Sequence, residues 1–128
     1  MRPNLRLISG ALAGAILGLA AASAIQARGP KAPHGYLVAE LEVTDPDTFE
    51  KYRTQVPATL APYKAHYVVR AGKVTALEGE PPKRFAIIEF ESVAQAQAWY
   101  NSEAYQTIAA IRHKSAKTRS FIIEGTVE

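Results

Sequence analysis

The hydrophobic pattern of the chain becomes regular at Tyr36–Val43, where apolar residues alternate with others. Leu37, Ala39 and Leu41 fall on one face, while Tyr36 and two glutamates fall on the other. Alternation with a period of two is typical of a strand that buries one face. We therefore expect the first strand here.

A helical repeat follows this strand. Thr44–Asp47 offers a capping side chain, a proline for the first turn and acidic residues for the positive end of the helix dipole. Apolar side chains then recur every three or four residues from Phe49 to Leu60. The pattern predicts a helix to about Ala61, kinked or tightened at Pro57 because proline lacks a backbone N–H.

Three further runs have the composition of strands, namely residues 65–71, 84–91 and 120–125. Gly72–Lys73 predicts a turn, and residues 74–77 predict a short return strand after it. The run 84–91 is apolar on both faces, so we expect it to be covered on both sides.

The stretch AWYNSEAYQ, residues 98–106, divides a second helical region into two segments. Ser92 is placed to cap the first segment and Ser102 the second. Cations suited to the negative end of a helix dipole close the second segment. They are Arg112, His113, Lys114 and Lys117.

The order strand, helix, strand pair, strand, helix, strand predicts an α+β fold of the ferredoxin-like βαββαβ plan with an extra β-hairpin. In this plan the last strand pairs with the first, the first with the third and the third with the second. Both helices cover one face of the sheet, although residues 84–91 are apolar on the other face too. We therefore expect a homodimer whose bare sheets pack together as a dimeric α/β barrel.

Composition narrows the possible functions. The 128 residues include 15 Lys and Arg against 12 Asp and Glu, but four of the cations precede Gly35 and every acid follows it. The folded body therefore has no cationic excess, and nucleic-acid binding is not expected. The chain has no cysteine, which excludes disulfides, thiolate nucleophiles and sulfur-ligated metal sites.

Residues 1–27 have the parts of a secretory signal peptide. MRPNLR is positive, residues 7–22 are apolar, and small residues precede a cleavage site after Ala24 or after Ala27, where we end the segment. Residues 28–34 are then a linker and residues 35–128 the domain, located in the periplasm or secreted, without membrane contact after cleavage. An uncleaved membrane anchor is the alternative.

Four segments carry a resemblance to a known family: HYVVRAGKVTALEG, RFAIIEFES, AWYNSEAYQ and FIIEG. In this order, over residues 35–126, they resemble the family called domain of unknown function 1330, of the dimeric α/β-barrel superfamily. The resemblance implies a dimer of ferredoxin-like subunits and no particular activity. Superfamily relatives include cofactor-free monooxygenases, isomerases and haem-binding peroxidases. Lys64–His66 departs from the family, whose members often have a glycine pair there.

Strand parity predicts a row of charged side chains. Glu40, Glu89 and Glu124 fall in line with Arg70 if the strand registers match. A buried carboxylate pairs with a cation or becomes protonated, as a proton donor or carbonyl binder requires. The row is either an ion-pair network that fixes how two sheets dock or part of a ligand pocket, with Arg70 and Glu89 as candidate catalytic residues.

The aromatic residues predict either a packed core or a small ligand pocket between the sheet and the helices. Trp99 is expected in the core. The tyrosines either pack there too or line a small pocket for a planar, mildly acidic or oxygen-rich molecule, since buried hydroxyls need partners. The candidate ligand-binding residues are Tyr36, Tyr52, Arg70, Glu89, Tyr100, Tyr105 and Arg112.

The histidines, His34, His66 and His113, lack the spacing of metal ligands. We therefore expect no metal and no cofactor, and a haem role for His66 or His113 rests on superfamily analogy alone. Three functions stay open. The chain is an exported homodimeric domain that binds a small organic molecule, a cofactor-independent monooxygenase- or isomerase-like enzyme, or a non-catalytic structural or interaction module.

Overall fold

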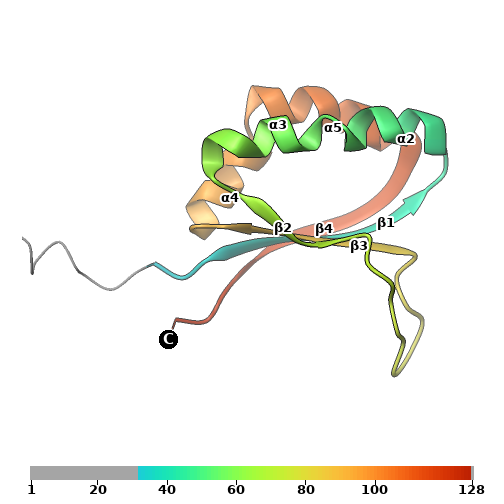
Figure 1. The fold of residues 1–128 in the computed structure, drawn as a ribbon, viewed down its shortest axis with the longest axis horizontal. Coiled ribbons are helices and arrows are strands. Elements are labelled where there is room, and N and C mark those ends of the chain that lie inside the picture. Colours follow the sequence, from blue (N-terminus) through green and yellow to red (C-terminus); the bar gives the residue numbers. More distant parts are fainter. Residues whose placement is uncertain (1–31, 128) are drawn as a thin grey trace, which may run out of the picture. The chain divides into compact units, whose positions relative to one another are not determined.

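A four-stranded antiparallel sheet with the order β2-β3-β1-β4 forms the base of the domain (Figure 1). The computed structural model describes residues 32–127, so the predicted signal peptide and most of the predicted linker lie outside the described residues. The strands are β1 (Gly35–Val43), β2 (His66–Arg70), β3 (Arg84–Phe90) and β4 (Ala116–Glu124). This strand order confirms the ferredoxin-like α+β class.

Helices cover one face of the sheet (Figure 1). The first crossover contains α2 (Pro46–Arg53), α3 (Val56–Leu60) and the 3-10 turn η1 (Ala61–Tyr63), and the second contains α4 (Val93–Tyr100) and α5 (Glu103–Ser115). The hydroxyl of Ser92 accepts from an N–H in the first turn of α4, and that of Ser102 does so for α5. Both predicted caps are thus confirmed. In the part of the chain that the structure describes, no helix is long and apolar enough to cross a membrane.

The predicted first helix is divided in two. The break falls at Thr54 and Gln55, whose side chains donate to the carbonyls of Glu50 and Lys51 at 3.1 and 2.7 Å. Pro57 therefore lies in the first turn of α3, where a missing N–H costs no helical hydrogen bond. The prediction of an interruption was right, but the chain breaks before the proline.

Residues 71–83 do not contain the predicted return strand. They form a loop that extends away from the sheet (Figure 1), and a hydrogen bond of 2.9 Å from the N–H of Ala71 to the carbonyl of Phe85 joins its ends. Leu77 is 93% exposed. The apolar residues of this loop find no neighbouring strand to pair with, which is why the extra hairpin predicted at 74–77 is absent from the described structure.

β4 begins at Ala116, four residues earlier than predicted. The carbonyl of Ser115, the last residue of α5, accepts from the N–H groups of Thr44 and Asp45 at 2.8 and 3.1 Å. This contact ties the end of α5 to the end of β1. The chain enters the sheet at once because its next residue, Ala116, already pairs with Val43.

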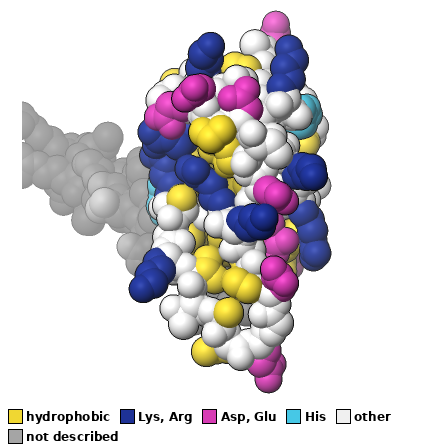
Figure 2. Space-filling model, turned by 90° about the vertical axis from the view of Figure 1, so that its right-hand side faces the viewer, with side chains coloured by type: hydrophobic (Ala, Val, Ile, Leu, Met, Phe, Trp, Pro, Cys, Tyr) yellow, Lys and Arg dark blue, Asp and Glu magenta, His cyan; other side chains and the backbone are white. Residues whose placement is uncertain are grey.

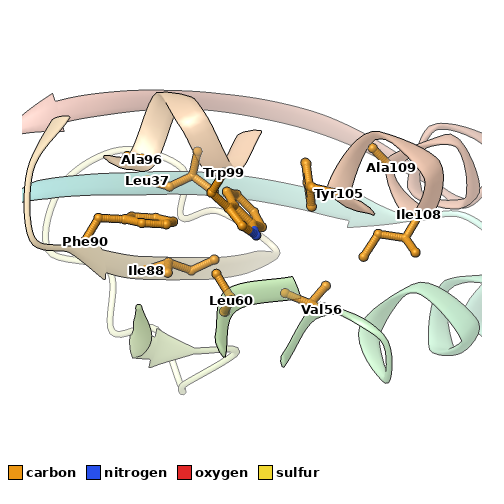
Figure 3. Close-up of a cluster of buried hydrophobic side chains, with 10 residues drawn as sticks. All are labelled: Leu37, Val56, Leu60, Ile88, Phe90, Ala96, Trp99, Tyr105, Ile108 and Ala109. Carbon is orange, nitrogen blue, oxygen red and sulfur yellow. The ribbon is translucent and has the colours of Figure 1, made fainter. Parts of the chain in front are cut away.

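Two hydrophobic clusters lie between the helices and the sheet. The larger, which we call the Trp99 cluster (Figure 3), has the buried members Leu37, Val56, Leu60, Ile88, Phe90, Ala96, Trp99, Tyr105, Ile108 and Ala109. The smaller, which we call the Phe49 cluster, consists of Leu41, Phe49 and Ala116. Trp99 is fully buried and donates from its indole N–H to the hydroxyl of Thr59 at 3.0 Å. The prediction that Trp99 belongs to the core is confirmed.

The opposite face of the sheet has no helix over it among the described residues (Figure 1). The strand register places Val38 of β1 between Ile87 of β3 and Phe121 of β4, with Phe85 and Ile123 on the same side. We call these five residues the open face. Phe121 and Ile123 are 42% and 52% exposed, so the described domain leaves large apolar side chains uncovered here.

Candidate functional site

A row of small side chains across the sheet leaves a cavity beneath the helices. Ser120, Ala39 and Ala86 lie opposite one another on β4, β1 and β3, and Arg70 on β2 ends the row. The sheet residues on one side of this row belong to the Trp99 cluster, and Leu41 on the other side belongs to the Phe49 cluster. The gap between the clusters is the cavity. About 50 Å³ of it is open to the centre of a water-sized sphere, several times what one water molecule needs.

Phenol and guanidinium groups dominate the polar lining of this cavity. The polar lining residues are Tyr52, Arg53, Tyr67, Arg70, Arg84, Tyr100, Tyr105, Arg112, Thr118 and Ser120. No Asp or Glu of residues 32–127 lines it. Figure 2 looks at the end of the domain where β3 begins, and hydrophobic side chains there lie among Lys, Arg, Asp and Glu side chains. The cavity is therefore cationic as well as aromatic.

Arg112 is the buried cation of the cavity. It is 5% exposed, its Nε has no hydrogen-bond partner, and its Nη2 lies 3.2 Å from Nε2 of His113. Within residues 32–127 no carboxylate lies within ion-pair distance of it. The hydroxyl of Thr118, also in the lining, is likewise buried without a partner. Buried polar groups are almost always hydrogen-bonded, so this end of the cavity has bonding capacity that the described chain leaves unused.

Two tyrosine hydroxyls meet in the cavity. The oxygens of Tyr52 and Tyr105 lie 3.0 Å apart, and the ring of Tyr105 packs on Trp99 with centroids 3.9 Å apart. Burial is the main cause that raises the pKa of Tyr52 well above its ordinary value, and the Tyr105 phenol adds to it. Burial also raises the pKa of Tyr67. Both Tyr52 and Tyr67 therefore stay protonated near neutral pH and can donate a hydrogen bond, but they cannot serve as bases.

The raised pKa of Tyr52 makes the stability of the domain sensitive to alkali. In the unfolded chain this phenol ionises near its ordinary value of 10.0, while in the folded chain it keeps its proton. The stabilisation is therefore complete below pH 10 and is lost as the pH rises further, by up to about 1.4 kcal/mol per pH unit. We expect Tyr52→Phe to flatten the decline of unfolding free energy measured in urea between about pH 10 and 11.5. Parallel declines in the variant and the parent chain would contradict this assignment.

Three more arginines stand toward the outer part of the cavity. Arg84 lies over the ring of Phe49, with Cζ 4.9 Å from the centroid, and Arg70 lies over the ring of Tyr67 at 4.6 Å. Arg70 is exposed, and its Nη2 lies 3.4 Å from the Arg53 carbonyl. Arg53 is paired with Glu50. Arg70 and Arg84 make no ion pair with a described carboxylate.

The structure brings together most of the residues that the sequence singled out for a pocket. The five of them that line the cavity are Tyr52, Arg70, Tyr100, Tyr105 and Arg112. Tyr36 and Glu89 do not, because they pair with each other on the opposite face of the sheet. The candidate catalytic pair Arg70 and Glu89 is therefore separated by the sheet.

The predicted row of charges is wrong. Glu40 lies opposite Phe85 and Arg119, Glu89 opposite Tyr36 and His66, and Glu124 opposite Gly35. The register of β2 shifts between Tyr67 and Val69, so Arg70 pairs with Ala86 on the helix side. A bulge moves every later side chain of a strand to the other face, and simple alternation did not foresee it.

Sequence reasoning missed several residues of the cavity. Arg84 was treated only as the start of a strand, and Thr118 was placed before the last strand. The small residues Ala39, Ala86 and Ser120 carried a usable signal, since small side chains at matching positions of neighbouring strands leave space. Their alignment emerges only once the register is known.

Glu89 has its own neighbours on the open side of the sheet. Its Oε1 lies 3.2 Å from Nδ1 of His34 and 3.9 Å from Nε2 of His66. Burial and then Glu89 raise the pKa of Tyr36. No group of three or more His, Asp or Glu within residues 32–127 is arranged to hold a metal ion.

The fold and its solved relatives define the class of protein. The described domain has the ferredoxin-like α+β fold of the dimeric α/β-barrel proteins. RPA0582, a protein of unknown function from Rhodopseudomonas palustris, matches with 13% identity and a TM-score of 0.60, over 84% of this chain and 94% of that chain. SnoaB, a cofactor-independent oxygenase from Streptomyces nogalater, matches with 12% identity and a TM-score of 0.52, over 76% and 97%.

The chain belongs to the family called domain of unknown function (DUF1330), whose model matches residues 34–126. This confirms the resemblance seen in the sequence. No curated protein matches the chain. At identities this low the solved relatives establish the fold alone.

Proposed function

We propose that this chain is an exported, homodimeric domain that binds a small organic anion between its sheet and its helices. The observation that carries the proposal is Arg112, a buried guanidinium with an unpartnered Nε and no described carboxylate beside it. A buried charge without a partner destabilises a fold. An anionic ligand would supply the missing partner.

The chemistry of the lining supports a planar acid as this ligand. A carboxylate or enolate oxygen can accept from Arg112, and the free hydroxyl of Thr118 in the same lining is a further donor. Guanidinium–carboxylate hydrogen bonds are the strong, charge-assisted kind. The rings of Tyr52, Tyr100 and Tyr105 offer aromatic faces inclined to one another, and a planar ligand can pack against one of them. No described carboxylate in the lining competes with or repels the ligand.

The open face supports the homodimer. Val38, Ile87 and Phe121 form a continuous apolar patch in the middle of an uncovered sheet. Two such sheets, packed face to face around a twofold axis, would bury the patch in both copies at once.

The leader supports export. Residues 1–27 carry the positive, apolar and small-residue segments of a signal peptide, which supports a mature chain in the periplasm or outside the cell. The absence of cysteine fits a domain that relies on its core and on a second copy for stability.

The test of the binding function is calorimetric titration of the full chain with benzoate as the probe. We expect Arg112→Met to weaken binding roughly 10- to 100-fold, since a charged hydrogen bond is lost. The free energy of unfolding should stay equal or rise, because an unpaired buried charge is removed. Lys114→Met, which removes an exposed cation from the same helix, is the matched control and should bind as the parent chain does. Equal binding by both variants would contradict the role of Arg112, and no binding by the parent chain would overturn the proposal in favour of a purely structural module.

A second candidate is an enzyme that works without a cofactor on such an anion. SnoaB is a cofactor-independent oxygenase, and protonated phenols beside guanidinium groups would stabilise an enolate or phenolate as its charge develops. Oxygen uptake with hydroquinones or enolisable aromatic ketones, lost in Arg112→Met, would support this activity. Binding without turnover of any such compound leaves the first candidate.

A further inference from the structure

We propose that the ligand carries two oxygen functions at opposite ends of a planar body, as an aromatic diacid or hydroxy acid does. This inference rests on the proposed function and adds the class of ligand. One guanidinium group lies over each ring of an aromatic pair on α2. Cζ of Arg84 lies 4.9 Å from the centroid of Phe49, and Cζ of Arg112 lies 6.0 Å from that of Tyr52. The two rings are neighbours, with centroids 5.4 Å apart.

The strand register keeps the two ends of the cavity apart. Arg84 on β3 and Thr118 on β4 lie opposite Leu41 from its two sides. The strands that carry them are therefore separated by the whole of β1, about 10 Å from each other. We assign Arg112 to the β4 end, because it lies three residues before the end of α5, which leads directly into β4.

The two ends differ in depth. At the inner end, Arg112 is 5% exposed and leaves Nε free, and the hydroxyl of Thr118 in the same lining is also buried and free. At the outer end, Arg84 is half-buried and Arg70 is exposed. A guanidinium stacked on a ring keeps its N–H edges available for an acceptor. The inner end therefore takes a carboxylate, and the outer end takes a second carboxylate or a hydroxyl.

The space between the two ends suits a flat body. The sheet contributes the small side chains of Ala39, Ala86 and Ser120 to the cavity, together with Leu41 between Arg84 and Thr118. The helix side contributes the rings of Phe49 and Tyr52. A planar molecule can lie between the small side chains and the rings with its long direction along the Arg84–Arg112 line.

Three probes that share one ring separate the possibilities: benzoate, 4-hydroxybenzoate and terephthalate. In titrations of the full chain, we expect both para-substituted acids to bind at least about tenfold more tightly than benzoate. Arg84→Gln should abolish this advantage. Lys83→Gln, which removes the neighbouring exposed cation, should preserve it.

Each outcome decides between the proposals. If the three probes bind equally and Arg112→Met weakens them all, the cavity is a single-anion site, so the ligand class proposed here is wrong while the proposed function stands. If the para-substituted acids still bind more tightly than benzoate to Arg84→Gln, the proposed role of Arg84 at the outer end is wrong. If no probe binds at millimolar concentration, both proposals fail. The comparison of probes on the unchanged chain needs no variant to fold.

Discussion

Replacing Trp99 by alanine is expected to lower the free energy of unfolding by about 3–5 kcal/mol. Trp99 is fully buried in the centre of the Trp99 cluster, with its ring 5.4 Å from Phe90 and 3.9 Å from Tyr105 between centroids. Truncation would leave a cavity among these rings. It would also leave the hydroxyl of Thr59 without the indole N–H that it accepts.

Chemical denaturation of the full chain, followed by circular dichroism, measures this loss. Gln97→Ala is the matched control, because Gln97 lies on the same helix with an exposed side chain, and we expect a change within about 0.5 kcal/mol. The loss of unfolding free energy for Trp99→Phe should lie between those for Trp99→Ala and Gln97→Ala, since this variant keeps most of the ring volume and loses the hydrogen bond. A loss below about 1 kcal/mol for Trp99→Ala would mean that Trp99 is not the centre of the core.

Phe121→Lys is expected to raise the dissociation constant of the proposed homodimer by at least roughly 100-fold. Phe121 is 42% exposed in the isolated domain and lies beside Val38 in the middle of the open face. A twofold interface would bury this ring twice, so one substitution removes two apolar contacts. It would also bring two ammonium groups into an apolar contact, where charge is costly.

Sedimentation velocity over a range of concentrations measures this change. Leu77→Lys is the matched control: it introduces the same charge at an apolar residue that is 93% exposed on the 71–83 loop, and we expect no effect on assembly. A parent chain that sediments as a monomer at micromolar concentration would overturn the homodimer.

The fold followed from the sequence because its signals are local. Alternation at Tyr36–Val43 depends only on neighbouring residues, and Ser92 and Ser102 cap helices within one turn of themselves. The burial of Arg112 also had a local signal, since it lies on the same helical stripe as Tyr105 and Ile108.

The site could be predicted from the sequence only in part, because it depends on the register between neighbouring strands. One shift between Tyr67 and Val69 moves Arg70 across the sheet and separates it from Glu89. The cavity itself exists because Ala39 and Ala86 align with each other on neighbouring strands. Neither the bulge nor the alignment is encoded within one element, so the hydrophobic pattern alone cannot reveal them.

The sheet order also determines when each strand can pair during synthesis. β1 is the first described strand to be synthesised, yet it lies inside the sheet, and both of its neighbours, β3 and β4, come later. A nascent chain emerges N-terminus first, so one edge of β1 stays unpaired until β3 is made and the other until β4 is made. During that interval the growing polypeptide presents bare strand edges, to which chaperones can bind.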